Sequence, residues 1–347
     1  MNTANFFDIV TYFQKTESKY SYNFDFRCIP SFSSPERYPE LEKVYQKYDS
    51  LRYQDDDSPI RNWMRYQISY YLTPKNQFDC DNCDEITTLF RALHWEIDTN
   101  PNGQPAIDSI FSFQSFWTKA TLQKASGLND HYLSKLVVTP AGKKTIQQIY
   151  YEKAQQHLEE FGCDLKHTRD LALKMWQYDA YEQYKAAIGA ELFAELERYA
   201  ALTFSLGNFM PCPPGNYSVA KDCSTNCLND RFDFLLSFLK KYKAGKSSLG
   251  YTMKEKKYRV EEQEMIDWIA WFNTGLDDIP DLPRMRRYYL DSFFEGGFID
   301  WNTSELKLLP MAGTKLSDYL RVASDIMEDR GYRIAVEIKQ VANMLVF

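Results

Sequence analysis

The sequence predicts a mainly α-helical protein, an irregular multi-helix bundle with a few short accessory strands. Apolar residues recur at helical spacing through most of the 347-residue chain, as they do on one face of an amphipathic helix. Strict alternation of apolar and polar residues, which is typical of a half-buried strand, is clearest in the short segment 20–26. These two patterns favour helices packed on helices over a large sheet.

Residues 1–140 are expected to form an N-terminal helical region with short strands. Ser58 and Pro59 mark a helix start, because serine can cap the first turn and proline fits the first helical position. Thr73-Pro74 ends that helix, since the residue before a proline is driven out of helical geometry. The other helices predicted in this region cover residues 5–13, 85–97 and 106–125.

Residues 141–347 are expected to form a second helical region, or to continue the first as one domain. Residues 143–161 are amphipathic, and Gly162 fits their C-terminal cap. Residues 207–227 contain three prolines, two glycines and three cysteines, which predicts a structured loop. The other helices predicted here cover residues 178–204, 228–242, 261–272, 315–329 and 332–345, the last two being separated at Arg330-Gly331.

Composition limits the class of protein and of partner. With 44% hydrophobic and 26% charged residues, the chain has the composition of a globular protein. The 25 Tyr, 23 Phe and 7 Trp predict an aromatic-rich core or, as an alternative, a partner surface. A net charge of −7 argues against binding that depends on phosphate contacts, although the basic run 240–257 leaves nucleic acid as a second candidate partner.

Targeting signals are missing from the sequence. The first ten residues lack a basic segment followed by an apolar one, and no apolar run approaches the roughly 18 residues of a membrane span. We therefore expect a cytoplasmic protein with no membrane contact and reduced cysteines.

Four of the seven cysteines form two closely spaced pairs that could together bind zinc. We expect ordinary thiols and no cofactor instead. Three aspartates beside the first pair oppose further anionic thiolates, and the two pairs are about 140 residues apart in the chain. The four residues are Cys80, Cys83, Cys223 and Cys227.

The sequence carries no complete set of catalytic residues. Phosphate-binding glycine loops and the motifs of zinc proteases and serine hydrolases do not occur. Each of the four histidines is expected to be structural, and His157, close to Glu159 and Glu160, is predicted to lie on the surface. Glu337-Ile338-Lys339 matches part of a restriction-type nuclease core, but that core needs a strand and the residues around it have helical spacing.

The most distinctive segment runs from Phe204 to Asp233. A predicted helix ends in Gly207-Asn208, prolines stiffen the residues after it, and asparagine side chains can hold such a loop rigid. An aspartate can favour the start of the next helix. We therefore predict that any binding residues lie here, the candidates being Asn208, Asn216, Lys221, Asp230 and Asp233.

Residues 199–240 resemble uncharacterised bacterial proteins in which a helix leads into a T-I-G-N-F-T-x-x-P segment. Here the corresponding residues are Ser205-Leu206-Gly207-Asn208-Phe209 and Pro211, with Asn216, Lys221 and the Asp230–Asp233 segment after them. The same asparagines and lysine are distantly similar to the C-terminal part of HNH-type endonuclease domains. That resemblance implies metal-assisted phosphodiester hydrolysis, but the histidine element that should precede them is absent.

These observations support two hypotheses about function. The first is an interaction or regulatory protein whose partner is another protein or a second copy, in a phage-defence or mobile-element setting suggested by analogy. The alternative is a nuclease-like hydrolase that uses a divalent metal near residues 207–233.

Overall fold

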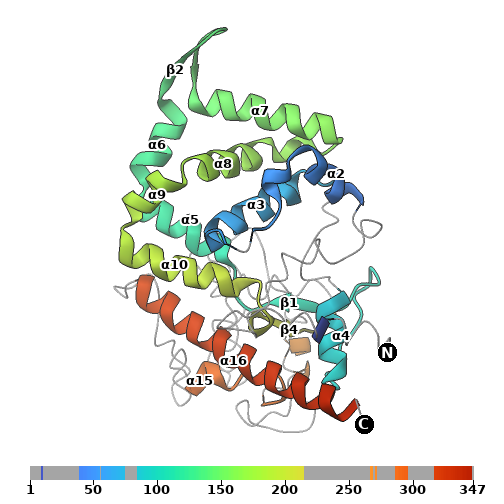
Figure 1. Ribbon diagram of the computed structural model, residues 1–347. Helices are drawn as coiled ribbons and strands as arrows, with labels where there is room; N and C mark the ends of the chain where they lie inside the picture. The colour runs from blue at the N-terminus through green and yellow to red at the C-terminus, as the bar shows by residue number, and fades with distance from the viewer. Residues whose placement is uncertain are drawn as a thin grey trace. The chain divides into compact units, whose positions relative to one another are not determined.

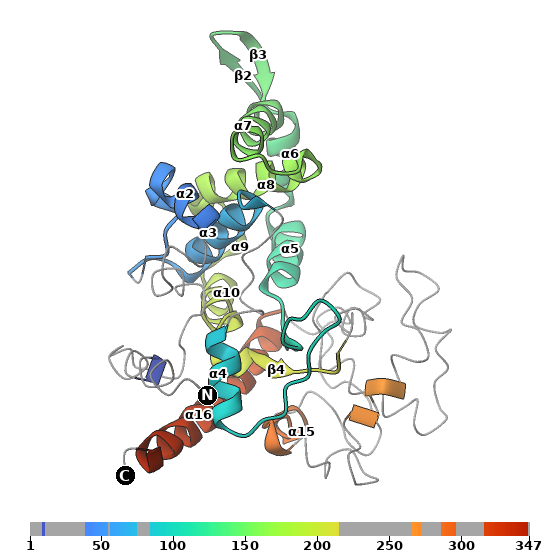
Figure 2. The same ribbon diagram turned by 90° about the vertical axis from the view of Figure 1, so that its right-hand side faces the viewer.

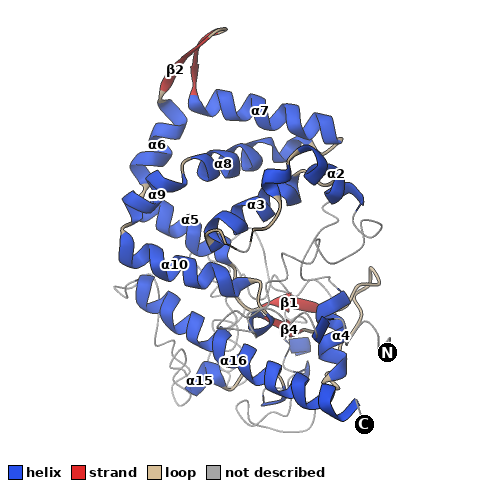
Figure 3. Ribbon diagram, in the orientation of Figure 1, coloured by secondary structure: helices blue, strands red, loops and turns tan. Residues whose placement is uncertain are grey.

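The structure is a computed structural model, and its elements are mainly helices, as the sequence predicts. Within the described residues the strands form two antiparallel pairs (Figure 3). The backbone contacts divide the chain into two compact parts, which we name unit 1 and unit 2. The described residues are 9–10, 39–54, 56–74, 84–214, 266–268, 270–271, 286–295 and 316–345.

The two units alternate along the chain. Of the described residues, unit 2 takes 39–54, 56–74 and 116–201, and unit 1 takes all the rest. The division predicted at residue 140 falls in the turn between two strands that pair with each other inside unit 2. Each unit therefore draws on parts of both predicted regions.

Unit 2 is an assembly of helices. The helix α8 packs against α3 on one side and against α7 on the other (Figure 1). The short 3-10 helices η2 (Asp49–Leu51) and η5 (Leu165–His167) connect neighbouring helices. The helices are α2 (Pro39–Lys47), α3 (Pro59–Tyr71), α5 (Phe113–Lys124), α6 (Ser126–Ser134), α7 (Ile146–Phe161), α8 (Thr168–Asp179), α9 (Tyr181–Ile188) and α10 (Ala190–Thr203), with the ends of α5 and α10 passing into unit 1.

Side-chain caps define the ends of α3 and α7. Ser58 accepts a hydrogen bond from the Arg61 amide at 3.2 Å and Pro59 is the first residue of α3, which confirms the predicted start. Thr145 and Gln148 form a reciprocal capping box at the start of α7. Gly162 ends α7 with a left-handed φ of 67°, as predicted.

The start of α7 differs from the prediction because a β-hairpin precedes it. Strand β2 (Leu136–Thr139) pairs antiparallel with β3 (Gly142–Thr145). The predicted helix began at residue 143, so its first three residues are in fact strand. Lys143 and Lys144 carry no apolar alternation, and it is the register with β2 that holds them extended.

Other predicted helix boundaries are wrong for local reasons. The helix predicted for 178–204 is divided at Ala180 and again at Gly189, whose φ of 91° no helix accepts. Residues 107–109 of the helix predicted for 106–125 instead form a strand. The helix predicted for 85–97 ends at Ala92, because His94, two residues later, has a left-handed φ of 57° that interrupts the helix.

Unit 1 contains the second sheet and the longest helix. Strand β1 (Ile107–Ser109) pairs antiparallel with β4 (Phe209–Pro211), with Asp108 opposite Met210. The 3-10 helix η6 (Leu206–Asn208) leads into β4, and α4 (Asp84–Ala92), α15 (Ser292–Glu295) and α16 (Leu316–Leu345) complete the described elements. Figure 2 shows β4 beside α16. The break predicted at Arg330-Gly331 is wrong, because α16 runs through it unbroken.

Gly207 of η6 lies directly against the backbone of α16. A methyl group at this position would collide with the Met327 carbonyl oxygen and lie 2.8 Å from the Gly331 amide nitrogen. Both obstacles are main-chain atoms of a helix, which cannot rotate aside as a side chain can. The position therefore excludes every residue with a Cβ.

Several predictions fall wholly or partly outside the described residues. They include the strand at 20–26, the helix at 228–242, most of the helix at 261–272, and all four paired cysteines. Among the described residues, none of the helices combines the length and the apolarity needed to cross a bilayer.

Replacing Gly207 by Ala is expected to destabilise the protein by about 3 kcal/mol or more, because overpacking against fixed backbone forces α16 away from η6. Gly127→Ala is the matched control. Gly127 is the second residue of helix α6, with open space around its Cβ position, so the same change should alter stability by under about 0.5 kcal/mol. Urea unfolding of the two variants measures both effects, and equal stabilities would contradict the close packing.

Candidate functional site

Of the five predicted binding residues, Asn208 lies within the described part of the chain. Its side chain is fully buried in unit 1. The amide oxygen accepts a hydrogen bond from the Phe111 amide at 2.9 Å, and the amide nitrogen donates to the carbonyls of Phe111 and Thr203. All of these partners are main-chain groups, so Asn208 joins three segments of unit 1.

The other four predicted binding residues, Asn216, Lys221, Asp230 and Asp233, lie outside the described residues. The prediction of a binding site at 207–233 therefore stays a prediction, as does the nuclease alternative. Glu337 lies in a continuous helix and accepts a hydrogen bond from the Tyr289 hydroxyl at 2.6 Å. This confirms the helical interpretation of Glu337-Ile338-Lys339. Within the described ranges no group of three or more potential ligands could hold a metal ion.

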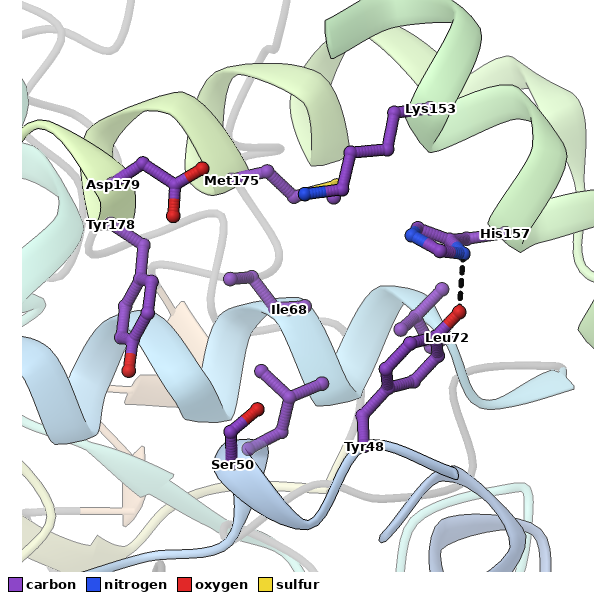
Figure 4. Close-up of a pocket in the computed structure, with 10 residues that line it drawn as sticks. Tyr48, Ser50, Ile68, Leu72, Lys153, His157, Met175, Tyr178 and Asp179 are labelled. Carbon is purple, nitrogen blue, oxygen red and sulfur yellow. Dashed lines mark hydrogen bonds between the residues drawn. The ribbon is translucent and has the colours of Figure 1, made fainter. Parts of the chain in front are cut away.

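A pocket with chemically varied walls lies in unit 2. It has a volume of about 150 Å³. Residues from η2, α3, α7 and α8 form its walls (Figure 4). Apolar side chains form one part and hydroxyl, imidazole, ammonium and carboxylate groups the other; the lining residues are Tyr48, Ser50, Leu51, Ile68, Leu72, Lys153, His157, Met175, Tyr178 and Asp179.

The elements around the pocket are held by part-buried polar contacts. Glu197 of α10 accepts hydrogen bonds from the Ser58 hydroxyl and, at 3.0 Å, from the Ile60 amide at the start of α3. A carboxylate is favoured there by the positive end of the helix dipole. Tyr181 also donates to Glu197, at 2.6 Å. These contacts fix where α3 begins, and so the position of its pocket-facing residues.

Arg65 of α3 connects the remaining walls. Its guanidinium is almost fully buried and forms an ion pair with Asp57. It also donates to the Ser50 carbonyl and to the Tyr178 hydroxyl, both at 3.0 Å, and to the Asn62 side chain at 2.9 Å. Ser50 and Tyr178 both line the pocket, whereas Arg65 does not. By bonding to both of them, Arg65 sets the spacing between η2 and α8.

The closest polar contact inside the pocket joins Tyr48 and His157. The Tyr48 hydroxyl lies 2.5 Å from His157 Nδ1, and the rings meet edge to face with centroids 4.9 Å apart. Burial, followed by the positive charges of Lys153 and Lys47, lowers the pKa of His157. Burial also raises the pKa of Tyr48. At neutral pH the pair is therefore an uncharged imidazole beside a protonated phenol.

Two opposite charges face the same pocket without pairing. Among the described residues Lys153 has no ion-pair partner, and its ammonium lies 5.8 Å from the centroid of the Tyr150 ring. Asp179 accepts a hydrogen bond from the Tyr150 hydroxyl at 2.6 Å. The Asp179 carboxylate therefore has a hydrogen-bond donor in Tyr150, and the Lys153 ammonium can bind another group.

The prediction for His157 is wrong, because the side chain is half-buried and lines a pocket. No local sequence signal could have found it. Tyr48 and His157 are 109 residues apart, and only the packing of α7 and α8 beside η2 brings them together. The neighbouring carboxylates that suggested a surface position, Glu159 and Glu160, do lie on the exposed side of α7.

Lys174 is a second perturbed cation in unit 2. Its side chain is buried, and its ammonium lies 4.3 Å from the centroid of the Trp63 ring, a cation–π contact. Burial lowers the pKa of Lys174 to about 7, and the charge of Asp170 partly opposes that shift. The ring offsets part of the cost of burying the charge.

The hairpin β2–β3 is the most exposed apolar feature of unit 2. Leu136 and Val138 point to the same face and are 61% and 78% exposed. Their cross-strand partners Thr145 and Lys143 lie on that face as well. On the other face Lys144 donates to Glu152 of α7 at 2.5 Å, which ties the hairpin to the helix. Figure 1 shows the hairpin extending beyond the ends of α6 and α7.

Comparison with protein-family models, curated proteins and solved structures finds no match to this chain. The resemblances of residues 199–240, and the phage-defence setting, stay predictions. Function must therefore be inferred from the pocket and the hairpin themselves.

Replacing Asn208 by Ala is expected to destabilise the protein by about 3 kcal/mol, because it leaves buried main-chain groups of Phe111 and Thr203 without partners. The control is Asn102→Ala. Asn102 is an exposed turn residue whose side chain bonds to Gln104, so that change should cost under about 0.5 kcal/mol. Chemical denaturation compares the two. An unaffected Asn208→Ala variant would refute the structural role and leave the amide available to a ligand.

The lowered pKa of Lys174 predicts that the stability of the protein depends on pH. Between about pH 7 and 9.5 the unfolded chain keeps the lysine proton while the folded protein loses it, so the free energy of unfolding should rise with pH. The slope from this residue is at most about 1.4 kcal/mol per pH unit. Lys174→Met should remove that rise, and Lys166→Met, at an exposed lysine of η5, should keep it. Parallel pH profiles of wild type and Lys174→Met would contradict the assignment.

Proposed function

We propose that this chain is a cytoplasmic interaction protein that binds a partner protein through the exposed face of the β2–β3 hairpin. The observation that supports it is the pair of exposed aliphatic side chains, Leu136 and Val138, on one face of an isolated two-stranded ribbon. The free thiols of Cys163 and Cys212 agree with a reducing compartment.

The hairpin has the properties of a template for strand addition. In a two-stranded sheet each strand has an outer edge whose amide and carbonyl groups pair with no other strand of that sheet. An extended peptide can add to such an edge through main-chain hydrogen bonds, and its alternate side chains then contact one face. Leu136 and Val138 would supply the apolar contact on that face.

The positive charges around the hairpin favour a partner with acidic side chains. Lys135 and Lys143 are both exposed on or beside the hairpin, and within the described ranges neither has an ion-pair partner. Lys144 is neutralised by Glu152. A strand carrying Asp or Glu beside its apolar residues would complement this surface. A second copy pairing through β3 would bring two Lys143 side chains together, which opposes self-association by this route. We therefore assign the surface to an acidic, extended segment of a different protein.

The test uses the full chain and two synthetic peptides, one of alternating Val and Glu and one of alternating Val and Lys. We expect the Val/Glu peptide to bind and the Val/Lys peptide to bind at least tenfold more weakly, because of Lys143. The double variant Leu136→Thr/Val138→Thr keeps strand propensity but removes the apolar contact, and should weaken Val/Glu binding at least tenfold. Fluorescence anisotropy of labelled peptides below their aggregation threshold measures each affinity.

Leu165→Thr is the matched control, since Leu165 is 45% exposed at a different place in unit 2, and it should bind like the wild type. Three outcomes would overturn the proposal: equal binding of both peptides, a double variant with unchanged affinity, or a dimer in sedimentation that the double variant abolishes. The last would assign the face to a second copy.

A further inference from the structure

The polar part of the unit 2 pocket includes two hydrogen-bond donors from α7, Lys153 and His157. Among the described residues the Tyr48 hydroxyl has His157 Nδ1 as its hydrogen-bond partner, so its proton is satisfied when it donates to that nitrogen. A neutral imidazole that accepts at Nδ1 carries its own proton on Nε2. In Figure 4 this second nitrogen is on the side of the ring toward Lys153 and Met175. In this tautomer, with Tyr48 as the donor, His157 presents an N–H group to the cavity.

Lys153 adds a positive charge beside that N–H group. It precedes His157 by one helical turn on α7, so the two side chains share a face. Its ammonium has no carboxylate partner among the described residues, and it is close enough to lower the pKa of His157. An ammonium and an imidazole N–H on one helix face offer donors and positive potential, which is the complement of an oxyanion.

The rest of the wall is apolar and limits the ligand's size. Leu51, Ile68, Leu72 and Met175 line it. The volume of about 150 Å³ is that of a cavity that can take a benzene-sized molecule. Inorganic phosphate or sulfate would leave these side chains without a contact, so the ligand should carry a short apolar body.

Asp179 limits the ligand's charge. Its carboxylate lines the same pocket and is already hydrogen-bonded by Tyr150. A second negative group on the ligand would have to approach this carboxylate and would be repelled by it. The pocket therefore favours a ligand with one negative charge over a ligand with two.

We propose that this pocket binds a small monocarboxylate, with the carboxylate held by Lys153 Nζ and His157 Nε2 and the apolar body against Leu51, Ile68, Leu72 and Met175. Tyr48 acts as a positioning residue that keeps the His157 N–H directed at the ligand. This site is independent of the hairpin surface, so either proposal can fail while the other stands.

The experiment titrates the full chain with benzoate and monitors the ring C–H signals of its histidines by NMR. With four histidines in the chain, the His157 signal is assigned by its loss in His157→Gln. We expect benzoate to shift the His157 signal in a saturable way. Benzyl alcohol, benzylamine and phthalate, which change the charge but keep the ring, should each bind at least tenfold more weakly.

Variants separate the roles of the polar groups. Lys153→Met keeps most of the length of the side chain and removes its charge, and should weaken benzoate binding at least tenfold. Tyr48→Phe should weaken it about threefold and also move the His157 signal in the absence of ligand, which a purely structural effect elsewhere would not do. Lys166→Met, outside the pocket, is the control and should bind benzoate like the wild type.

Three results would refute the proposal. The first is that benzoate and benzyl alcohol bind equally, which would make the pocket merely apolar. The second is that no His157 shift occurs up to millimolar benzoate in folded wild type. The third is that Lys153→Met, shown to be folded by its unchanged thermal midpoint, binds benzoate as well as the wild type.

Discussion

The packing of η6 and the start of β4 against α16 is the contact on which unit 1 depends. Gly207 allows two backbones to touch, and Arg330 of α16 then bonds to the carbonyls on either side of the contact, those of Gly207 and Phe209. The same guanidinium donates to the Tyr288 carbonyl at 3.0 Å. One side chain thus fastens three separate segments, and Asn208 fastens η6 to the segment after β1.

A buried arginine suits this position for reasons of geometry more than of charge. Its planar group carries five donors in fixed directions, so it can donate to three carbonyls at once. Arg330 is 0% exposed. Burial, followed by the charge of Arg333, lowers the pKa of Arg330 to about 9, while Asp291 and Asp329 partly compensate. The group stays charged at neutral pH, and its charge-assisted bonds to carbonyls offset its desolvation.

Local chemistry made some elements predictable. Ser58-Pro59 and Gly162 mark helix ends through caps that need no tertiary partner, and both predictions are confirmed. Arg330-Gly331 shows the opposite case, since glycine weakens an isolated helix but the carbonyls of other segments bind Arg330 and hold α16 continuous. Lys143 and Lys144, which the sequence predicts to be helical, form a strand because they pair with β2. The pocket could not be predicted, because Tyr48 and His157 meet only after α3, α7 and α8 pack. Asn208 was recognised as unusual, and its described contacts are all structural.

The distance along the chain between Arg330 and its partners has a consequence for synthesis. Arg330 is 123 residues beyond Gly207, so a growing chain exposes the Gly207-Asn208 segment long before its partner helix has left the ribosome. Closing so long a loop is slow compared with local helix formation. Unit 2, whose described segments end at residue 201, has all its parts earlier. During translation the β1 and η6 segments therefore remain unpacked until α16 has been made, and apolar side chains such as Leu206 and Phe209 stay exposed to solvent. A chaperone would be needed most in this interval.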